Sequence, residues 1–391
     1  MVYIIKKDGT KEEFDANKIK RAVNKSAGRV MYRFTDDEIN FICKYATDRA
    51  EAMSRERKGG KIMIQDMHNI VEGALEQVNP AVAKSYRDYR NYKVDFIHMM
   101  DEVYTKSQSI RYIGDKSNAN TDSALVATKR SLIFNELNKE LYRKFFMNRN
   151  ELQACKDGYI YIHDQSARLD TMNCCLFDVG SVLRGGFEMG NVWYNEPKTL
   201  DTAFDVMGDI ILSTAAQQYG GFTVPEVDKI LSPYAQKSYN KYYEEFLKYS
   251  DPSWEGREEK GRVYAWEKVC RDCDQGWQGI EYKLNTVGSS RGDYPFVTVT
   301  LGLGTGRFEK MISKSLLKVH MGGQGKAGHK KPVLFPKIVF LYDEEIHGDG
   351  KECEDVFETG VACSAKTMYP DWLSMSGQGY ISSMYKKYKK S

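Results

Sequence analysis

The sequence predicts an α/β fold that follows a small unit of one β-hairpin and four helices. Residues 295–303 alternate apolar and polar side chains with the period of a strand, and residues 332–342 form a buried apolar run. Long helical patterns separate the strands along the chain, which favours an α/β, barrel-like arrangement. With 391 residues, the chain is long enough for two domains.

The composition is typical of a globular protein that does not cross a membrane. Apolar residues make up 41% of the chain and charged residues 28%. No run approaches the roughly 18 apolar residues that a membrane helix needs. The N-terminal "MVYIIKKDGTKEEF" carries charges where a signal peptide is apolar, so we expect a cytoplasmic location. The net charge of +3 is too small to indicate a direct nucleic-acid partner.

The first unit is expected to cover residues 1–95. "VYIIK" and "TKEEF" flank a turn at residues 8–9 and predict a hairpin. Asp15 can cap the N-terminus of a first helix, and a second helix is expected over residues 36–53. A third helix starts near Gln65, and Pro80 opens a fourth at its first helical position.

The second unit is expected to follow a connecting segment over residues 96–116. A helix over 133–147 leads to "DGYIYIHD", a short strand-like run at residues 157–164. A long amphipathic helix covers about 200–218, and another helix begins after Pro225.

The cysteines divide into three groups. Four isolated ones are expected to be small buried side chains in a reduced protein: Cys43, Cys155, Cys353 and Cys363. Cys270 and Cys273 have the spacing of a redox or zinc pair, but no second ligand pair lies nearby, so they are left unassigned and no metal site is predicted. Cys174 and Cys175 are adjacent in "DTMNCCLFD", and each is a candidate for a catalytic thiol as well as for a core position.

Two glycine-rich segments have the composition of phosphate loops. "GLGTG" at residues 302–306 follows a strand but departs from the dinucleotide pattern, and "GGQGKAG" at 322–328 lacks the features of a P-loop. Both are predicted to be turns.

Basic residues of the first unit could hold a polyphosphate. They lie on the hairpin, on the first helix, at the start of the third helix and late in the fourth: Lys6, Lys7, Lys18, His68, Arg90 and Lys93. Such cations would form charge-assisted hydrogen bonds to phosphate. The same pattern also fits an ordinary solvated surface, and spacing alone leaves both interpretations open.

The first unit resembles the ATP-cone, a nucleotide-sensing regulatory domain of many ribonucleotide reductases. The resemblance is carried by "IIKKDGTKEEFDANKIKRAV" and "IQDMHNIV". It implies that ATP and dATP act as allosteric effectors. It also implies that five residues contact the nucleotide: Lys6, Lys7, Glu12, Lys18 and His68.

Residues 117–391 resemble the N-terminal part of the ten-stranded α/β barrel of anaerobic, glycyl-radical ribonucleoside-triphosphate reductases. The motifs occur in the family's order: "SNANTDSALVATKR", "GYIYIHD", "MNCCLFD", "QYGGFTVPEVDKILSPY", "SSRGDYPFVTVTLG" and "SAKTMYPDW". The resemblance implies reduction of NTPs to dNTPs by thiyl-radical chemistry, with formate as a possible reductant. A radical S-adenosylmethionine activase is the implied partner, and a homodimer is expected, with helices 130–146 and 200–218 as candidates for its interface.

The resemblance also assigns residues. The family's "N-C" register places the reducing thiol at Cys174, whereas Cys175 would point to the other face if it lies on a strand. Asn118, Asn120, His163 and Arg291 are expected to line the active site or the neighbouring effector site.

The chain ends before the family's thiyl-cysteine, zinc and glycyl-radical segments. We therefore expect no reductase activity from this polypeptide alone, and a second polypeptide that completes the barrel. The alternatives are a non-catalytic nucleotide-binding fragment and another glycyl-radical enzyme.

Overall fold

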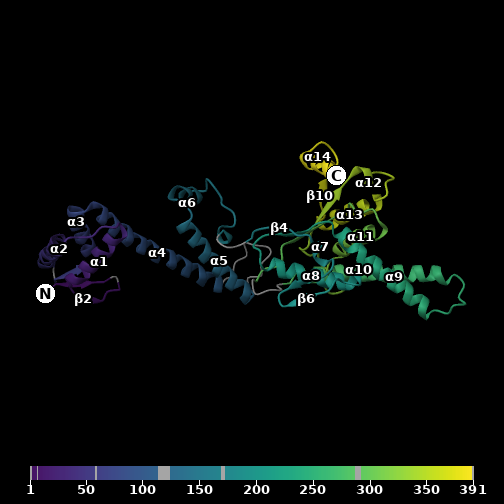
Figure 1. The fold of residues 1–391 in the computed structure, drawn as a ribbon, viewed down its shortest axis with the longest axis horizontal. Coiled ribbons are helices and arrows are strands. Elements are labelled where there is room, and N and C mark those ends of the chain that lie inside the picture. Colours follow the sequence, from purple (N-terminus) through teal and green to yellow (C-terminus); the bar gives the residue numbers. More distant parts are fainter. Residues whose placement is uncertain are drawn as a thin grey trace. The chain divides into compact units, whose positions relative to one another are not determined.

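The computed structural model describes residues 2–6, 8–57, 60–112, 124–168, 172–286 and 292–389. It divides into two compact units, Met1–Thr105 and Lys106–Ser391 (Figure 1). Among the described helices, none is both long and apolar enough to cross a membrane.

The first unit contains a three-stranded sheet with the order β2-β1-β3. Strand β1 (Tyr3–Ile5) pairs antiparallel with β2 (Lys11–Glu13), so the predicted hairpin is confirmed. The parallel neighbour of β1, β3 (Lys61–Met63), was not expected, because its three residues follow a Lys- and Gly-rich stretch with no strand pattern.

Four helices complete the first unit: α1 (Ala16–Arg29), α2 (Asp36–Glu56), α3 (Ile64–Val78) and α4 (Pro80–Tyr112). The predicted cap of α1 is confirmed, since Asp15 Oδ1 accepts a hydrogen bond of 2.8 Å from the backbone N–H of Asn17. Ile19 and Val23 of α1 are buried against Ile42, Ile62 and other apolar side chains, which fixes the orientation of the helix.

Helix α4 is longer than the sequence analysis suggested. It continues through most of the expected connecting segment, because the chain has no glycine or proline between Pro80 and Gly114 to end it.

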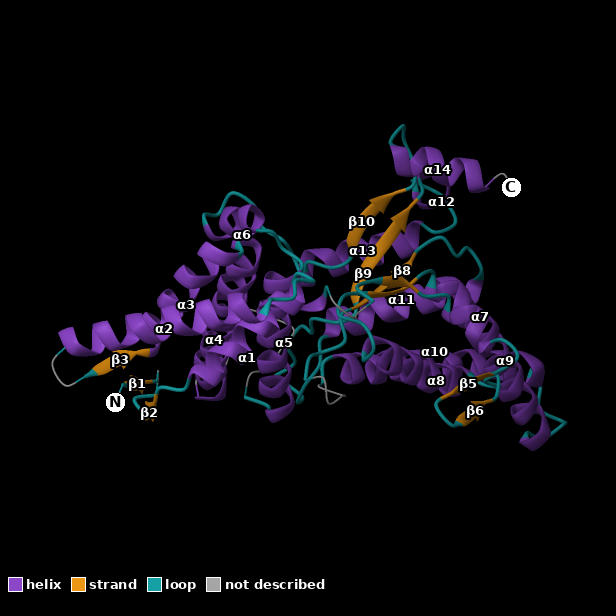
Figure 2. Cartoon of the chain, turned by 60° about the vertical axis from the view of Figure 1, so that its left-hand side comes forward, coloured by secondary structure: helices purple, strands orange, loops and turns teal. Residues whose placement is uncertain are grey.

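The second unit is built on a five-stranded, entirely parallel sheet with the order β10-β9-β8-β7-β4. Figure 2 shows β8, β9 and β10 of this sheet. The strands are β4 (Cys175–Leu176), β7 (Phe222–Val224), β8 (Val297–Leu301), β9 (Lys337–Tyr342) and β10 (Asp371–Ser374). The predicted α/β class is therefore confirmed, whereas closure of the sheet into a barrel stays a prediction.

Helices connect the strands, as a parallel sheet requires. The helices before and between the strands are α5 (Val126–Phe145), α6 (Arg149–Lys156), α7 (Val179–Leu183), α8 (Leu200–Ala215), α9 (Val227–Tyr249), α10 (Arg257–Leu284), α11 (Arg307–Gly322), α12 (Glu344–His347) and α13 (Glu354–Thr367). The remaining elements are the 3-10 turn η1 (Gln165–Ala167), the hairpin strands β5 (Phe187–Met189) and β6 (Val192–Tyr194), and α14 (Tyr380–Lys389).

The two strands predicted from their patterns are confirmed in shorter form. Val297, Val299 and Leu301 of β8 point into the core, and the residues between them are half-buried. Strand β9 begins only after Pro336, because proline has no N–H to donate to the sheet.

The strand-like pattern at residues 157–164 was misleading, because this segment is irregular. Gly158 and Asp164 have φ angles of +78° and +55°, which a strand does not adopt. Tyr159 and Tyr161 are about 84% and 85% exposed, so the apolar alternation does not reflect burial.

Both glycine-rich segments are turns, as predicted. In the loop after β8, the buried carboxylate of Asp228 on α9 accepts hydrogen bonds from the N–H groups of Gly302 and Gly304, at 3.1 and 3.2 Å, and from the Ser313 hydroxyl. A carboxylate of the chain itself thus occupies the place that a phosphate would take. Gln324 and Lys331 exchange two backbone hydrogen bonds across the second turn.

Replacement of this buried carboxyl group should destabilise the second unit. Asp228→Ala is expected to lower the free energy of unfolding by about 3 kcal/mol, since each buried donor left without an acceptor costs about 1–3 kcal/mol. Denaturant titration measures the change. Asp205→Ala is the control, because Asp205 is an exposed partner of Lys283 and should have little effect. Equal stability of the two variants would contradict this role for Asp228.

The same carboxyl should give stability a pH dependence. Burial raises the pKa of Asp228 above its ordinary value of 3.8, so the folded chain retains a proton that the unfolded chain releases. The free energy of unfolding should therefore fall as the pH rises from about 3.8 through the folded-state pKa. Asp228→Asn should remove this part of the slope, and an unchanged slope would show that another group causes it.

Candidate functional site

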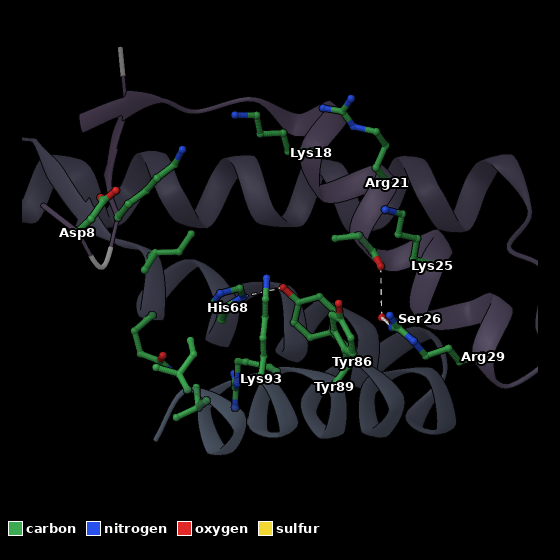
Figure 3. Close-up of a pocket in the computed structure, with 17 residues that line it drawn as sticks. Asp8, Lys18, Arg21, Lys25, Ser26, Arg29, His68, Tyr86, Tyr89 and Lys93 are labelled. Carbon is green, nitrogen blue, oxygen red and sulfur yellow. Dashed lines mark hydrogen bonds between the residues drawn. The ribbon is translucent and has the colours of Figure 1, made fainter. Parts of the chain in front are cut away.

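A strongly basic pocket of about 870 Å³ lies in the first unit, between the β1–β2 hairpin, α1, the start of α3 and α4 (Figure 3). Seven Lys and Arg residues line it: Lys6, Lys18, Arg21, Lys25, Arg29, Arg90 and Lys93. Among the described lining residues, Asp8 is the one carboxylate. The pocket therefore has the charge to attract a multiply charged anion.

Helix α1 contributes four of these cations from a single face. Lys18, Arg21, Lys25 and Arg29 recur at helical spacing, so their side chains follow one stripe along the helix. The apolar stripe of α1 is buried in the core, which leaves the basic stripe to face the pocket. Three of these residues were not predicted, although their spacing in the sequence would have indicated them: Arg21, Lys25 and Arg29.

Three of the predicted nucleotide-binding residues meet at one edge of the pocket. Glu12 forms ion pairs with Lys6, at 2.7 Å, and with Lys18. The carboxylate holds the two ammonium groups together, and it is not itself among the lining residues. Lys7, the fourth predicted residue, lies outside the described residues.

His68, the fifth predicted residue, lies inside the pocket beside Tyr86 of α4. Its Nδ1 atom is 2.8 Å from the Tyr86 hydroxyl. Burial raises the pKa of Tyr86 to about 12, so this hydroxyl stays protonated and can donate to His68. Tyr89 lies one turn farther along α4, and the guanidinium of Arg29 on α1 stacks 3.8 Å from the centre of its ring. This pair gives the pocket an aromatic and cationic wall.

A second pocket of about 600 Å³ lies in the second unit. It is formed by one face of α5 and by loops at the edge of the parallel sheet, where β4 pairs with β7. Its lining residues are Thr128, Ser131, Leu132, Asn135, His163, Asp164, Asn173, Cys174, Tyr219, Gly220, Gly221, Gly292, Asp293 and Phe296. The structure thus brings the predicted residues His163 and Cys174 into one pocket, while Asn118, Asn120 and Arg291 lie outside the described residues.

Cys174 is the one exposed cysteine of the eight, all of which are described. The backbone N–H of Gly221 donates to its Sγ atom at 3.2 Å, and this sulfur lies 3.8 Å from Asn173 Oδ1. Cys175 begins β4, is half-buried against the core, and accepts a hydrogen bond from Gln218 Nε2. The two adjacent thiols therefore have different surroundings, as the strand geometry predicted.

Gly220 has no side chain, and the Cys174 sulfur occupies the space that a Cβ atom there would need. A Cβ atom at this position would lie 2.6 Å from Cys174 Sγ and 2.6 Å from the backbone oxygen of Asn173. Gly220 belongs to the "QYGG" motif, but its contact with Cys174 was not predicted, since the two residues are 46 positions apart.

Cys270 and Cys273 lie on α10, where Cys273 belongs to the hydrophobic core and Cys270 packs against it. Cys273 is fully buried, and burial raises the pKa of both thiols, which keeps them protonated. Within the described parts of the chain, no three His, Cys, Asp or Glu side chains gather closely enough to hold a metal ion.

These features describe an α/β protein with one strongly basic pocket and another built around an exposed thiol. Comparison with known families agrees: residues 117–390 match the family model of anaerobic ribonucleoside-triphosphate reductase, and residues 2–94 match that of the ATP cone domain. The chain belongs to the anaerobic ribonucleoside-triphosphate reductase family.

The curated relatives are longer than this chain. It is 32% identical over 382 residues to the anaerobic ribonucleoside-triphosphate reductase of Haemophilus influenzae, covering 95% of this chain and 52% of the relative. The Escherichia coli reductase is 30% identical over 387 residues, with 95% and 51% covered. The Enterobacteria phage T4 reductase is 36% identical over 261 residues, with 66% and 41% covered. The chain thus spans about half the length of its bacterial relatives.

A solved structure is also similar. The anaerobic ribonucleotide reductase from Thermotoga maritima, in complex with dATP and CTP, aligns with a TM-score of 0.44 and 13% sequence identity over 72% of this chain and 50% of that one.

A side chain at Gly220 should disturb the thiol pocket. Gly220→Ala is expected to lower the free energy of unfolding by about 1–3 kcal/mol and to change the rate at which iodoacetamide labels Cys174, because the new methyl group overlaps the sulfur. Gly279→Ala on α10 is the control, since no atom lies within 4 Å of its Cβ position. It should raise stability by about 0.5–1 kcal/mol. Peptide mass spectrometry measures labelling, and identical labelling in both variants would contradict the packing argument.

Proposed function

We propose that this chain forms the nucleotide-regulated and thiol-bearing part of an enzyme that reduces ribonucleoside triphosphates to deoxyribonucleoside triphosphates under anaerobic conditions. The observation that carries the proposal is the exposed thiol of Cys174 in a pocket of about 600 Å³, in a chain of this family. A pocket of this volume is in the range of small-molecule sites.

In the proposed reaction, Cys174 is the reducing thiol. The family chemistry uses a thiyl radical to remove the 3′ hydrogen of the ribose. A second thiol on the opposite face gives one hydrogen atom as the 2′ hydroxyl leaves as water, and formate, by its oxidation to carbon dioxide, would complete the two-electron reduction. The Gly221 N–H and the absence of a side chain at Gly220 position Cys174 for this role. His163 shares the pocket, and Asn118, Asn120 and Arg291 are proposed to complete the site.

Further components follow from the same proposal. The enzyme would act with a radical S-adenosylmethionine activase and as a homodimer in the cytoplasm. Family membership predicts three further components: a glycyl radical, a zinc site and formate as the reductant.

The basic pocket is proposed to bind ATP and dATP as effectors. A triphosphate would replace Glu12 as the partner of Lys6 and Lys18, and the basic stripe of α1 would neutralise the remaining phosphate charge. The match of residues 2–94 to the ATP cone domain supports this role.

Calorimetry on the full chain tests the effector site. ATP and dATP should each bind, and Lys6→Ala combined with Lys18→Ala should weaken binding by about 3–6 kcal/mol, since each charge-assisted contact contributes about 1.5–3 kcal/mol. Lys20→Ala is the control, because this exposed residue of α1 does not line the pocket. Unaltered affinity in the double variant would exclude this pocket as the nucleotide site.

Substitution of each adjacent cysteine tests the catalytic proposal. Cys174→Ser should abolish dNTP formation, in an assay that supplies activase, S-adenosylmethionine, formate and any further polypeptide the enzyme requires. Nucleotide binding to the first unit should be unchanged. Cys175→Ser should retain turnover and lower stability by about 1–3 kcal/mol, because it places a hydroxyl against the core. Equal loss of turnover in the two variants would contradict the assignment of Cys174.

A further inference from the structure

Asp164 lies at the centre of a series of polar contacts on the wall of the thiol pocket. Its Oδ2 atom is 2.5 Å from His163 Nδ1 and accepts a hydrogen bond of 3.4 Å from Asn173 Nδ2. Asn173 Oδ1 in turn lies 3.8 Å from the Sγ atom of Cys174. All four residues line the same pocket, so one carboxylate connects the imidazole to the thiol.

The backbone at Asp164 is in an uncommon conformation. Its φ and ψ angles of 55° and 39° lie in the left-handed region, which non-glycine residues rarely adopt and which is often found at functional sites. The Asp164 carbonyl accepts from the N–H of Ala167, and Arg143 of α5 donates to Gln165 in the same turn. These bonds hold the turn so that the Asp164 side chain is 18% exposed, whereas His163 is 72% exposed.

The contact with Asp164 selects between the two neutral tautomers of the His163 ring. An ionised carboxylate only accepts hydrogen bonds, so the neutral imidazole must present Nδ1–H to Asp164. The other nitrogen, Nε2, then carries the lone pair and is available as a proton acceptor.

The same carboxylate sets the orientation of Asn173. The amide must direct its NH₂ group to Asp164, since an ionised carboxylate cannot donate. The amide oxygen is thereby turned toward Cys174, where it can accept from the thiol S–H.

From these contacts we infer that Asp164 is a positioning residue of the proposed reduction. It holds His163 as the Nδ1–H tautomer and directs the Asn173 amide oxygen to the Cys174 thiol. The catalytic consequence rests on the proposed function, whereas the tautomer can be measured independently of turnover.

Nitrogen NMR of the full chain tests the tautomer. With ¹⁵N-labelled histidine and a His163→Gln variant to assign the signal, His163 should show Nδ1–H in the unmodified chain. Asp164→Gly removes the carboxylate but tolerates the left-handed backbone, and it should shift His163 toward the Nε2–H form that free histidine prefers. Asp164→Asn also tolerates this backbone and should shift the His163 tautomer equilibrium by a smaller amount. It replaces the glycine variant in the test if that variant does not fold.

The control is Asp157→Asn, which changes an exposed carboxylate whose side chain contacts Gln153 and lies nearby in the sequence. It should leave the His163 tautomer unchanged. An Nε2–H tautomer in the unmodified chain, or an Nδ1–H tautomer that persists in both Asp164 variants, would overturn the inference.

Turnover in the complete assay separates positioning from a structural role. Asp164→Gly should lower kcat by about 10²-fold, the lower end of what a positioned acid–base group contributes. In a His163→Gln background the same change should have a much smaller effect, because its main partner is gone. Equal effects in the two backgrounds would contradict action through His163. Absence of dNTP from the unmodified enzyme would instead count against the proposed function and leave the tautomer result standing.

Discussion

The thiol site depends on the backbone pairing of residues 173–175 with residues 220–221. The N–H of Gly220 donates to the Asn173 carbonyl, and the N–H of Cys175 donates to the Gly221 carbonyl. This register gives two adjacent cysteines opposite surroundings: Sγ of Cys174 faces the pocket, whereas Cys175 packs against the core. A shift of one residue would exchange the two thiols, so the register determines which sulfur is available for chemistry.

Anionic charge is handled differently in the two units. In the second unit, the buried Asp228 carboxyl group accepts from the N–H groups of Gly302 and Gly304 in a glycine-rich loop, so these two donors are not free to bind an external anion. In the first unit, Glu12 pairs with two lysines at the pocket edge, and their side chains remain partly exposed. Exposed ion pairs contribute little to stability, so replacement of Glu12 by the proposed polyphosphate would cost little free energy.

Local signals in the sequence predicted much of the fold. The hairpin, the Asp15 cap, the helix start at Pro80 and strand β8 each depend on a few neighbouring residues, and all are present. Of the positions that received no predicted role, Arg21, Lys25 and Arg29 could have been recognised from their helical spacing, whereas Gly220 has its partner, Cys174, far along the chain. Family resemblance supplied Cys174 and His163, but Asp164 acts through a backbone conformation and contacts that no spacing rule encodes.

The solvent exposure of Cys174 has a consequence for the fate of the protein in air. Thiols oxidise in order of their access to the oxidant, through sulfenic acid to irreversible products. Cys273, Cys353 and Cys363 are buried, and burial raises the pKa of each, so they resist this chemistry. Oxygen damage should therefore concentrate on the sulfur atom that the proposed reduction needs, and the fold would survive an exposure to air that ends activity.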